Sequence, residues 1–268
     1  MQQDARRHFY LVRGLVREAR HWGALPDLLR MAFPGARVTT LDIPGAGAYF
    51  RDASPTKVEA MVTAMRQDFL QVRREGEDAT LIAISLGGMI ASHWLHTHRW
   101  DFQRAVLINT SFGSLSPMWH RLRPAAMGWL ARALMTSANE REGVMLRLVS
   151  NHADAYDSSL ALWQSIRRER PVSLSNSVRQ LWAATRFRSN IGAPPVPVLL
   201  LAGRADRMVS VECSRAIARA WRAPLIEHSS GGHDLSVDAP DWILEQVRLW
   251  LRNTPVDAES GAGFAVAP

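Results

Sequence analysis

The fold class is decided by the stretch Ala79-Thr-Leu-Ile-Ala-Ile-Ser85-Leu-Gly-Gly-Met-Ile-Ala91. It begins with a short apolar run typical of a buried strand and continues into the apolar pattern of a helix. Ser85 stands at the junction, and the small residues Ala83, Gly87 and Gly88 lie close to it on either side. Small side chains let a strand and a helix meet in a sharp turn, so we expect the Ser85 hydroxyl to be exposed at a strained strand-to-helix turn.

This arrangement is typical of a nucleophile elbow, whose usual pattern is Gly-x-Ser-x-Gly. Ala83 takes the place of the first glycine, and alanine is still small enough for the close approach of strand and helix. The N-terminus of the helix would direct backbone N–H groups toward the serine, and we expect the N–H of Leu86 to be one donor to a developing oxyanion. From this segment alone, a serine that merely caps the helix is an open alternative.

Short apolar runs recur along the chain, each followed by a turn and then a helical pattern. This alternation predicts an α/β fold with a mostly parallel sheet of about six strands flanked by helices. Strands are expected at 9–12, 37–41, 80–84, 105–108, 196–201 and 224–227. Helices are expected at 18–31, 56–74, 86–98, 210–221 and 240–252. Asp238 is placed to cap the last helix, and Pro240 suits its first turn.

The interval 112–190 breaks this alternation, because it holds helical segments and no clear strand. We therefore expect an α/β core formed by residues 1–111 and 191–253, with a helical cap inserted at 112–190. Small residue types and few large apolar groups predict a flexible tail at 254–268. A chain of 268 residues is within the reach of a single core that carries such an insertion.

Two later segments supply an acid and a base. Asp206 follows a buried strand, and His233 lies in a glycine-rich loop before the last helix. Hydrolases built on this kind of turn have the chain order serine, acid, histidine. His233 would take the proton of Ser85, while Asp206 would fix the tautomer of the imidazole. The alternatives are a turn or cap role for Asp206 and an exposed loop position for His233, with His228 as the substitute base.

A second oxyanion donor is expected from the loop after the first strand, where Leu11-Val-Arg13-Gly14-Leu15 occupies the place of a common His-Gly-x pattern. The donor would be the backbone N–H of Leu15. Arg13 replaces the usual histidine, and since the donor is a backbone group, this replacement concerns how the loop is held. Taken alone, the segment is better explained by Gly14 as a plain turn glycine.

Five motifs are similar, in order and spacing, to those of the α/β-hydrolase superfamily of serine hydrolases. They are Arg13-Gly14, Asp42-Ile-Pro-Gly-Ala-Gly47, Ser85-Leu-Gly-Gly88, Gly203-Arg-Ala-Asp206 and Gly232-His233. A narrower similarity is to small carboxylesterases such as pimeloyl-acyl-carrier-protein methyl ester esterase, which have a helical cap over the same sheet. The superfamily resemblance covers nearly the whole chain and implies a triad of Ser85, Asp206 and His233, an acyl-enzyme intermediate and no dissociable cofactor.

We therefore expect a hydrolase for an ester, or a thioester, with a small or medium apolar acyl group. The interval 112–190 is rich in Trp, Met and Leu, and Trp119 and Trp163 are the residues expected to bind the acyl substrate. Its arginines would suit an acidic acyl carrier protein as partner, although a solvated helical face is the favoured explanation for them. Hydrolysis of a carbon–carbon bond or a lactone on the same triad, and ligand binding without turnover, remain open alternatives.

Composition argues against several other classes of protein. The formal charge is +7, but the basic residues are scattered among acidic ones, so we do not expect nucleic-acid binding. The single cysteine, Cys213, excludes an intramolecular disulfide, and without a Cys cluster or a His-Glu-x-x-His pattern we expect no metal site. The sequence shows neither a signal-peptide core nor an apolar run of about 20 residues, so we expect a cytoplasmic protein without a membrane span.

Overall fold

The computed structural model describes residues 5–152, 156–189 and 192–254. At its centre is a six-stranded, all-parallel sheet with the order β2-β1-β3-β4-β5-β6. The strands are β1 (Arg7–Val12), β2 (Arg37–Leu41), β3 (Asp78–Ile84), β4 (Arg104–Ile108), β5 (Val198–Gly203) and β6 (Leu225–His228). The predicted α/β fold with about six mostly parallel strands is thus confirmed, and each strand overlaps its predicted range.

The central strands are apolar on both sides because helices cover both faces of the sheet. In β1, Tyr10 and Val12 pack into one core, whereas Phe9 and Leu11 pack into the other. Successive side chains of a strand point to opposite faces, so an uninterrupted apolar run suits a parallel sheet that is buried on both faces. The same reasoning explains why the apolar run that ends at Ser85 is a central strand.

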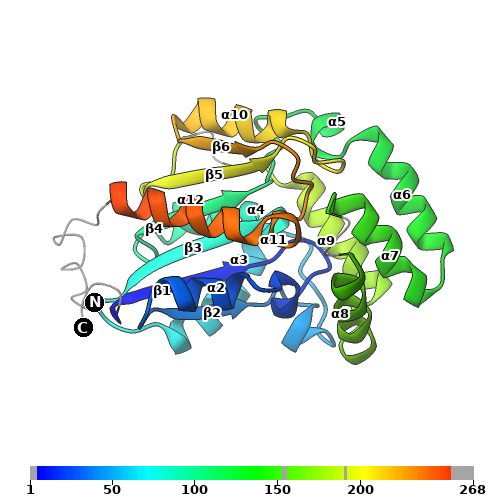
Figure 1. The fold of residues 1–268 in the computed structure, drawn as a ribbon, viewed down its shortest axis with the longest axis horizontal. Helices are drawn as coiled ribbons and strands as arrows, with labels where there is room; N and C mark the ends of the chain where they lie inside the picture. Colours follow the sequence, from blue (N-terminus) through cyan, green and yellow to red (C-terminus); the bar gives the residue numbers. More distant parts are fainter. Residues whose placement is uncertain (1–4, 153–155, 190–191, 255–268) are drawn as a thin grey trace.

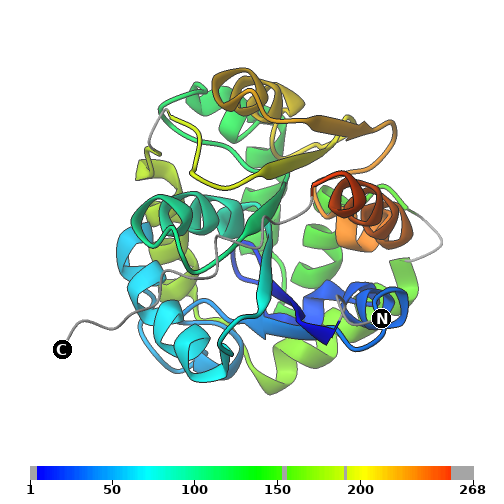
Figure 2. The same ribbon diagram turned by 90° about the vertical axis from the view of Figure 1, so that its left-hand side faces the viewer.

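Two helical layers enclose the sheet, as Figure 2 shows in an end-on view. One face is covered by α3 (Val58–Val72), α4 (Leu86–Thr97) and α10 (Val211–Trp221), and the other by α2 (Leu25–Ala32) and α12 (Pro240–Asn253). Three short elements complete the connections, namely η1 (Ala19–Trp22), η2 (Gly47–Tyr49) and α11 (Leu235–Asp238). None of the helices within the described part of the chain is both long enough and apolar enough to cross a membrane.

Two sequence predictions about helix ends are wrong. The single helix expected at 18–31 is divided into η1 and α2 at Gly23, whose φ of 57° is a conformation that glycine adopts readily. Asp238 does not cap the last helix, since Ala239 is the N-cap of α12 and makes no side-chain capping bond. Instead, the Asp238 carboxylate accepts a hydrogen bond from the backbone N–H of Gly232 at 2.6 Å, so its charge stabilises the loop that contains His233.

The interval 112–190 contains α5 (Met118–Arg121), α6 (Pro124–Met135), α7 (Ala138–Val149), α8 (Tyr156–Glu169) and α9 (Leu174–Arg186), and no strand among its described residues. In Figure 1 these helices lie beyond the edge at which the strands end. They have a small core of their own, made of Ala126, Leu146, Leu148, Val149 and Trp163. Whether 112–190 forms a cap with these bounds stays a prediction. Of the predicted tail at 254–268, residues 255–268 lie outside the described residues.

Candidate active site

Ser85 joins β3 to α4 in a strained backbone conformation, with φ 57° and ψ −119°. Two glycines make this turn possible. A Cβ on Gly87 would lie 2.4 Å from the carbonyl oxygen of Val12, and a Cβ on Gly88 would lie 2.5 Å from Cβ of Thr110. Gly87 and Gly88 are therefore required by the close approach of α4 to Val12 and Thr110.

A chain of hydrogen bonds links Ser85 to two side chains from distant loops. Oγ of Ser85 lies 3.0 Å from Nε2 of His233, and Nδ1 of His233 lies 2.7 Å from Oδ2 of Asp206. A carboxylate can only accept, so Nδ1 carries the proton and Nε2 is free to accept from the serine hydroxyl. The Ser85 side chain makes no capping bond to α4. The structure thus brings together the three residues that the sequence singled out.

The second carboxylate oxygen of Asp206 holds a turn. Oδ1 accepts hydrogen bonds from the backbone N–H groups of Met208 at 2.7 Å and Val209 at 2.9 Å. The turn role that was an alternative for Asp206 and its contact with His233 are therefore both present, one on each oxygen. Because both oxygens are engaged and the residue is buried, the carboxylate has a fixed orientation toward the imidazole.

The charges around His233 favour its protonated form. Burial opposes the imidazolium, but the charge and the hydrogen bond of Asp206 outweigh burial, so the pKa of His233 is raised above its ordinary value of 6.5. Asp234 adds to this rise and Arg13 opposes it. The imidazole is therefore a stronger base than a solvent-exposed histidine, and it is in its neutral, proton-accepting form only at a pH above this raised pKa.

Asn109, which the sequence reasoning missed, joins the loops of the acid and the base. It follows β4 with a φ of 46°. Its Nδ2 donates to the carbonyl oxygens of Gly232 at 3.0 Å and His233 at 2.8 Å, and its Oδ1 accepts from the N–H of Gly203 at 2.9 Å. An asparagine directly after a buried strand, at the edge where Ser85 lies, was the available signal, since asparagine tolerates the left-handed conformation.

The predicted oxyanion loop lies against the serine. A Cβ on Gly14 would lie only 2.9 Å from Cβ of Ser85, so the backbone of this loop touches the serine directly. The backbone N–H groups of Leu15 and Leu86 donate no hydrogen bond to another part of the described chain. Both N–H groups are thus free of acceptors within the described chain, and an oxyanion hole formed by them stays a prediction.

Arg13, which stands where the family commonly has histidine, binds the loop that follows His233. Its NH1 donates to Oδ1 of Asp234 at 3.1 Å and to Oγ of Ser236 at 2.7 Å, and its NH2 donates to Oδ2 of Asp234. The guanidinium lies 4.9 Å from the centre of the Trp22 ring. The replacement therefore changes how the loop is held, as the sequence suggested, by forming a buried ion pair.

Comparison with known proteins identifies the family of this chain. The sequence profile of the alpha/beta hydrolase family matches residues 9–246. The chain belongs to the α/β-hydrolase family. A search of curated proteins finds no match.

Solved structures share the fold of this α/β hydrolase. The esterase RhEst1 from Rhodococcus sp. ECU1013 superposes with a TM-score of 0.75 and 17% identity, over 94% of this chain and 92% of that chain. A bromoperoxidase from Bacillus anthracis gives 0.74 and 18%, over 92% of each chain. A lipase-esterase related protein from Clostridium acetobutylicum gives 0.72 and 15%, over 92% and 95%. At these identities the likeness establishes the fold, and the fold alone does not fix the reaction.

The two tryptophans expected to bind substrate differ in their exposure in this α/β hydrolase. Trp163 is only 1% exposed and belongs to the core of the helices α6 to α8, so it has no surface that a ligand could reach in this conformation. Trp119 is 64% exposed on α5. His228, the alternative base, has other contacts: its Nδ1 accepts the N–H of Gly231 at 2.8 Å, and its ring packs edge-on against Trp242.

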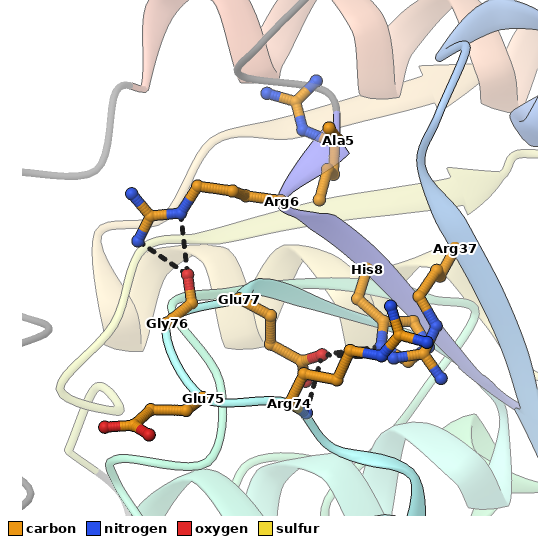
Figure 3. A pocket seen from close by; sticks show the side chains of 9 residues that line it. Ala5, Arg6, His8, Arg37, Arg74, Glu75, Gly76 and Glu77 are labelled. Atoms are coloured by element: carbon orange, nitrogen blue, oxygen red, sulfur yellow. Dashed lines mark hydrogen bonds and ion pairs between the residues drawn. The ribbon is translucent and has the colours of Figure 1, made fainter.

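Two hollows in the structure lie away from Ser85. One, of about 260 Å³, opens at the amino ends of β1, β2 and β3 (Figure 3). Its polar groups are largely satisfied by one another, since Arg6 donates to the carbonyl of Gly76 and Glu77 bonds His8 at 2.8 Å. The other, of about 320 Å³, lies between the start of β5 and the ends of α10 and α12. Neither contains a residue of the Ser85 hydrogen-bond chain.

Other nucleophiles and metal ligands are less well placed. Cys213 is buried in α10, and burial raises the pKa of its thiol to about 11, so the thiol is protonated at neutral pH. Within residues 5–152, 156–189 and 192–254, no three or more His, Cys, Asp and Glu side chains gather where they could hold a metal ion. Ser85 is therefore the nucleophile that the geometry favours.

Proposed function

We propose that this α/β hydrolase is a serine hydrolase that cleaves carboxylic esters through an acyl-enzyme. The observation that carries the proposal is the hydrogen-bond chain from Ser85 through His233 to Asp206, with Ser85 at a strained turn. Membership of the family and neighbours named as esterases agree with it.

The first half of the reaction forms the acyl-enzyme. Nε2 of His233 takes the proton of the Ser85 hydroxyl while Oγ attacks the carbonyl carbon of the ester, and the carbonyl oxygen becomes an oxyanion. Asp206 stabilises the imidazolium without taking its proton. When the intermediate collapses, the bond to the leaving oxygen breaks, and the imidazolium gives its proton to the departing alcohol.

The second half returns the enzyme to its starting state. Water attacks the acyl-enzyme carbonyl, and His233 takes one of its protons to form a second tetrahedral intermediate. Collapse of this intermediate releases the carboxylic acid and returns the proton to Ser85. In both halves the oxyanion would lie between the N–H groups of Leu15 and Leu86, and one such donor typically contributes about 10²- to 10³-fold in kcat.

The proposed substrate is an ester, or a thioester, of a small or medium apolar acyl group. Support comes from the position of α5 to α9 beyond the edge at which Ser85 lies, and from the Trp, Met and Leu residues of the interval 112–190. A thioester is attacked by the same nucleophile at the same carbonyl carbon. Carbon–carbon bond and lactone hydrolysis use the same groups, and a substrate screen separates these reactions.

Fluorophosphonate labelling tests the mechanism. We expect intact-mass spectrometry to show one adduct on the native protein and none on folded Ser85→Ala or His233→Ala, because only an activated serine attacks the phosphorus. A native protein that stays unlabelled while folded would argue instead for a ligand-binding member of the fold. A labelled protein that ignores p-nitrophenyl esters and thioesters alike would contradict the substrate class only.

Gly14→Ala is expected to lower kcat by about a hundredfold, because displacing reacting groups by about 1 Å has an effect of this size. The added Cβ would lie 2.9 Å from Cβ and 3.4 Å from Oγ of Ser85, so the serine or the loop must shift. Gly128→Ala in α6 is the matched control, since a Cβ there meets nothing within 4 Å. The measurement is kcat for ester hydrolysis by both variants. A Gly14→Ala protein as active as Gly128→Ala would show that Gly14 does not pack closely on Ser85.

A further inference from the structure

Val16 has an unusual backbone conformation next to the proposed oxyanion loop. Its φ is 61°, and positive values at other described non-glycine residues occur at Ser85, Asn109 and Arg222. Arg222 is the C-cap of α10, where the left-handed conformation is common. Ser85 and Asn109 belong to the candidate active site. For a β-branched residue this conformation is strained, and such strain persists only where the surrounding structure enforces it.

A side chain of α9 holds the backbone N–H of Val16. Oε1 of Gln180 accepts the backbone N–H of Val16 at 2.8 Å, across 164 positions of the chain. Val16 directly follows Leu15, whose N–H is the proposed oxyanion donor, and Gly14 lies against Ser85. A single side-chain acceptor therefore fixes the residue next to the donor.

The side chain of Gln180 has an unfavourable environment for one of its two polar atoms. Its side chain is fully buried, and its Nε2 has no hydrogen-bond partner in the described structure. A buried amide with an unused donor destabilises a protein, and such groups are rare unless they serve another purpose. A methionine would fill a similar volume without the unused donor, but it would leave the N–H of Val16 without its acceptor, so it is the acceptor that accounts for a glutamine here.

Asn176, one turn earlier on the same face of α9, shows the contrast. Its Oδ1 accepts the N–H of Ser54 at 2.9 Å, and its Nδ2 donates to the carbonyl oxygens of Gly45 at 3.3 Å and Asp52 at 2.9 Å. Both ends of this amide are used, and the loop that they hold follows β2 rather than contacting Ser85. Asn176 is therefore a structural anchor of α9.

We propose that Gln180 is a positioning residue for the oxyanion hole. Its Oε1 holds Val16 in the left-handed conformation and thereby aims the N–H of Leu15 at the oxyanion of the tetrahedral intermediate. A helix from the interval 112–190 thus contributes to catalysis through the backbone of the core, without touching the substrate. The inference rests on the proposed function, since it requires an oxyanion at Leu15.

Gln180→Met is the test, with Asn176→Leu as the matched control on the same face. We expect Gln180→Met to lower kcat by about ten- to a hundredfold while KM stays within about threefold, because the donor acts in the transition state and not in the bound ester. Asn176→Leu is expected to lower the Tm and to keep kcat within about twofold of the native value. Ester hydrolysis and thermal unfolding of both variants supply the readouts.

Three results would overturn the inference: a Gln180→Met protein with native kcat, one with raised KM and unchanged kcat, or an Asn176→Leu protein that loses as much kcat. If Gln180→Met fails to fold, Gln180→Asn, which withdraws the acceptor by one methylene, is measured against the same expectations. A native protein that neither labels at Ser85 nor hydrolyses any ester would overturn the proposed function as well. An active native protein together with a Gln180→Met variant of unchanged kcat would overturn this inference alone.

Discussion

Replacing Asp206 with asparagine is expected to lower kcat by about 10⁴-fold in a protein that stays folded. Oδ1 of Asp206 accepts from the backbone N–H groups of Met208 and Val209, so an asparagine keeps its carbonyl oxygen on that side. Its NH₂ group then faces Nδ1 of His233, which has to accept a hydrogen bond instead of donating one. The imidazole proton moves to Nε2, and this nitrogen can no longer take the proton of Ser85.

The same variant is expected to change the pH dependence. In the native site, Asp206 outweighs burial and raises the pKa of His233, and because the neutral base is the active form, kcat/KM falls as the pH drops through that raised pKa. Without the carboxylate, burial prevails and the pKa of His233 falls. Asp234 and Arg13, the other charges near the imidazole, are present in both proteins. The residual activity of Asp206→Asn should therefore persist to lower pH.

Profiles of kcat/KM between about pH 5 and pH 9 measure both effects. Circular dichroism of native and variant protein controls for folding. A folded Asp206→Asn protein that keeps kcat within about tenfold of native, or one whose acid limb does not move, would show that Asp206 only holds the turn.

The elements that position the site could be predicted because their signals are local. The apolar run before Ser85 and the small residues after it predict β3 and α4 to within two residues of their observed ends. Asp206 and His233 follow strands of the same parallel sheet, and the carboxyl ends of parallel strands meet at one edge. The positions of Asp206 and His233 after these strands were therefore enough to predict that the two side chains meet.

The residues that hold the loops together could not be predicted in this way, because their partners are distant in the chain. Asn109 bonds Gly203 and Gly232, which are 94 and 123 positions away. Asp238 has the sequence context of a helix cap, one residue before Ala239 and two before Pro240. Its carboxylate instead accepts a hydrogen bond from the buried N–H of Gly232, and no local sequence pattern predicts this bond.

Apolar composition likewise does not separate a binding surface from a core. Trp163 fits either interpretation in the sequence, but it packs with Leu146 and Val149, and the Arg17 guanidinium lies 3.9 Å from its ring centre. A helical insertion needs apolar residues for its own core before any are available for a ligand. The sequence therefore shows that the interval 112–190 is rich in Trp, Met and Leu, and only the structure shows which of these side chains pack in its core.

Replacing Arg13 with methionine is expected to destabilise the protein by about 3–5 kcal/mol near neutral pH, the usual result of breaking a buried ion pair on one side. The side chains of Arg13 and Asp234 are 4% and 5% exposed. Without the guanidinium, the Asp234 carboxylate keeps the hydroxyl of Ser236 at 2.7 Å but loses its bidentate cation. Arg30→Met is the control, because the side chains of Arg30 and its partner Asp27 are 50% and 78% exposed. This substitution should lower the free energy of unfolding by less than about 1 kcal/mol.

The pH dependence of this loss identifies its cause. Burial would raise the pKa of Asp234, but Arg13 outweighs burial and holds that pKa below its ordinary value, so the native pair stabilises the fold until the pH falls through the lowered pKa. In Arg13→Met burial prevails, the pKa of Asp234 rises above its unfolded value, and protonation relieves the buried charge. Urea unfolding at about pH 7.5 and about pH 5 should therefore show a smaller loss at the lower pH.

An equal loss at both pH values, or a loss no larger than that of Arg30→Met, would show that the Asp234 charge is not what Arg13 compensates. Adding Asp234→Asn to Arg13→Met removes that charge and should restore part of the stability, because an amide is far less costly to bury than a carboxylate. Arg13 precedes the loop of Leu15, and Asp234 follows His233. The pair therefore joins the proposed oxyanion loop to the loop of the proposed base. The double variant should accordingly regain more of the native stability than of the native activity.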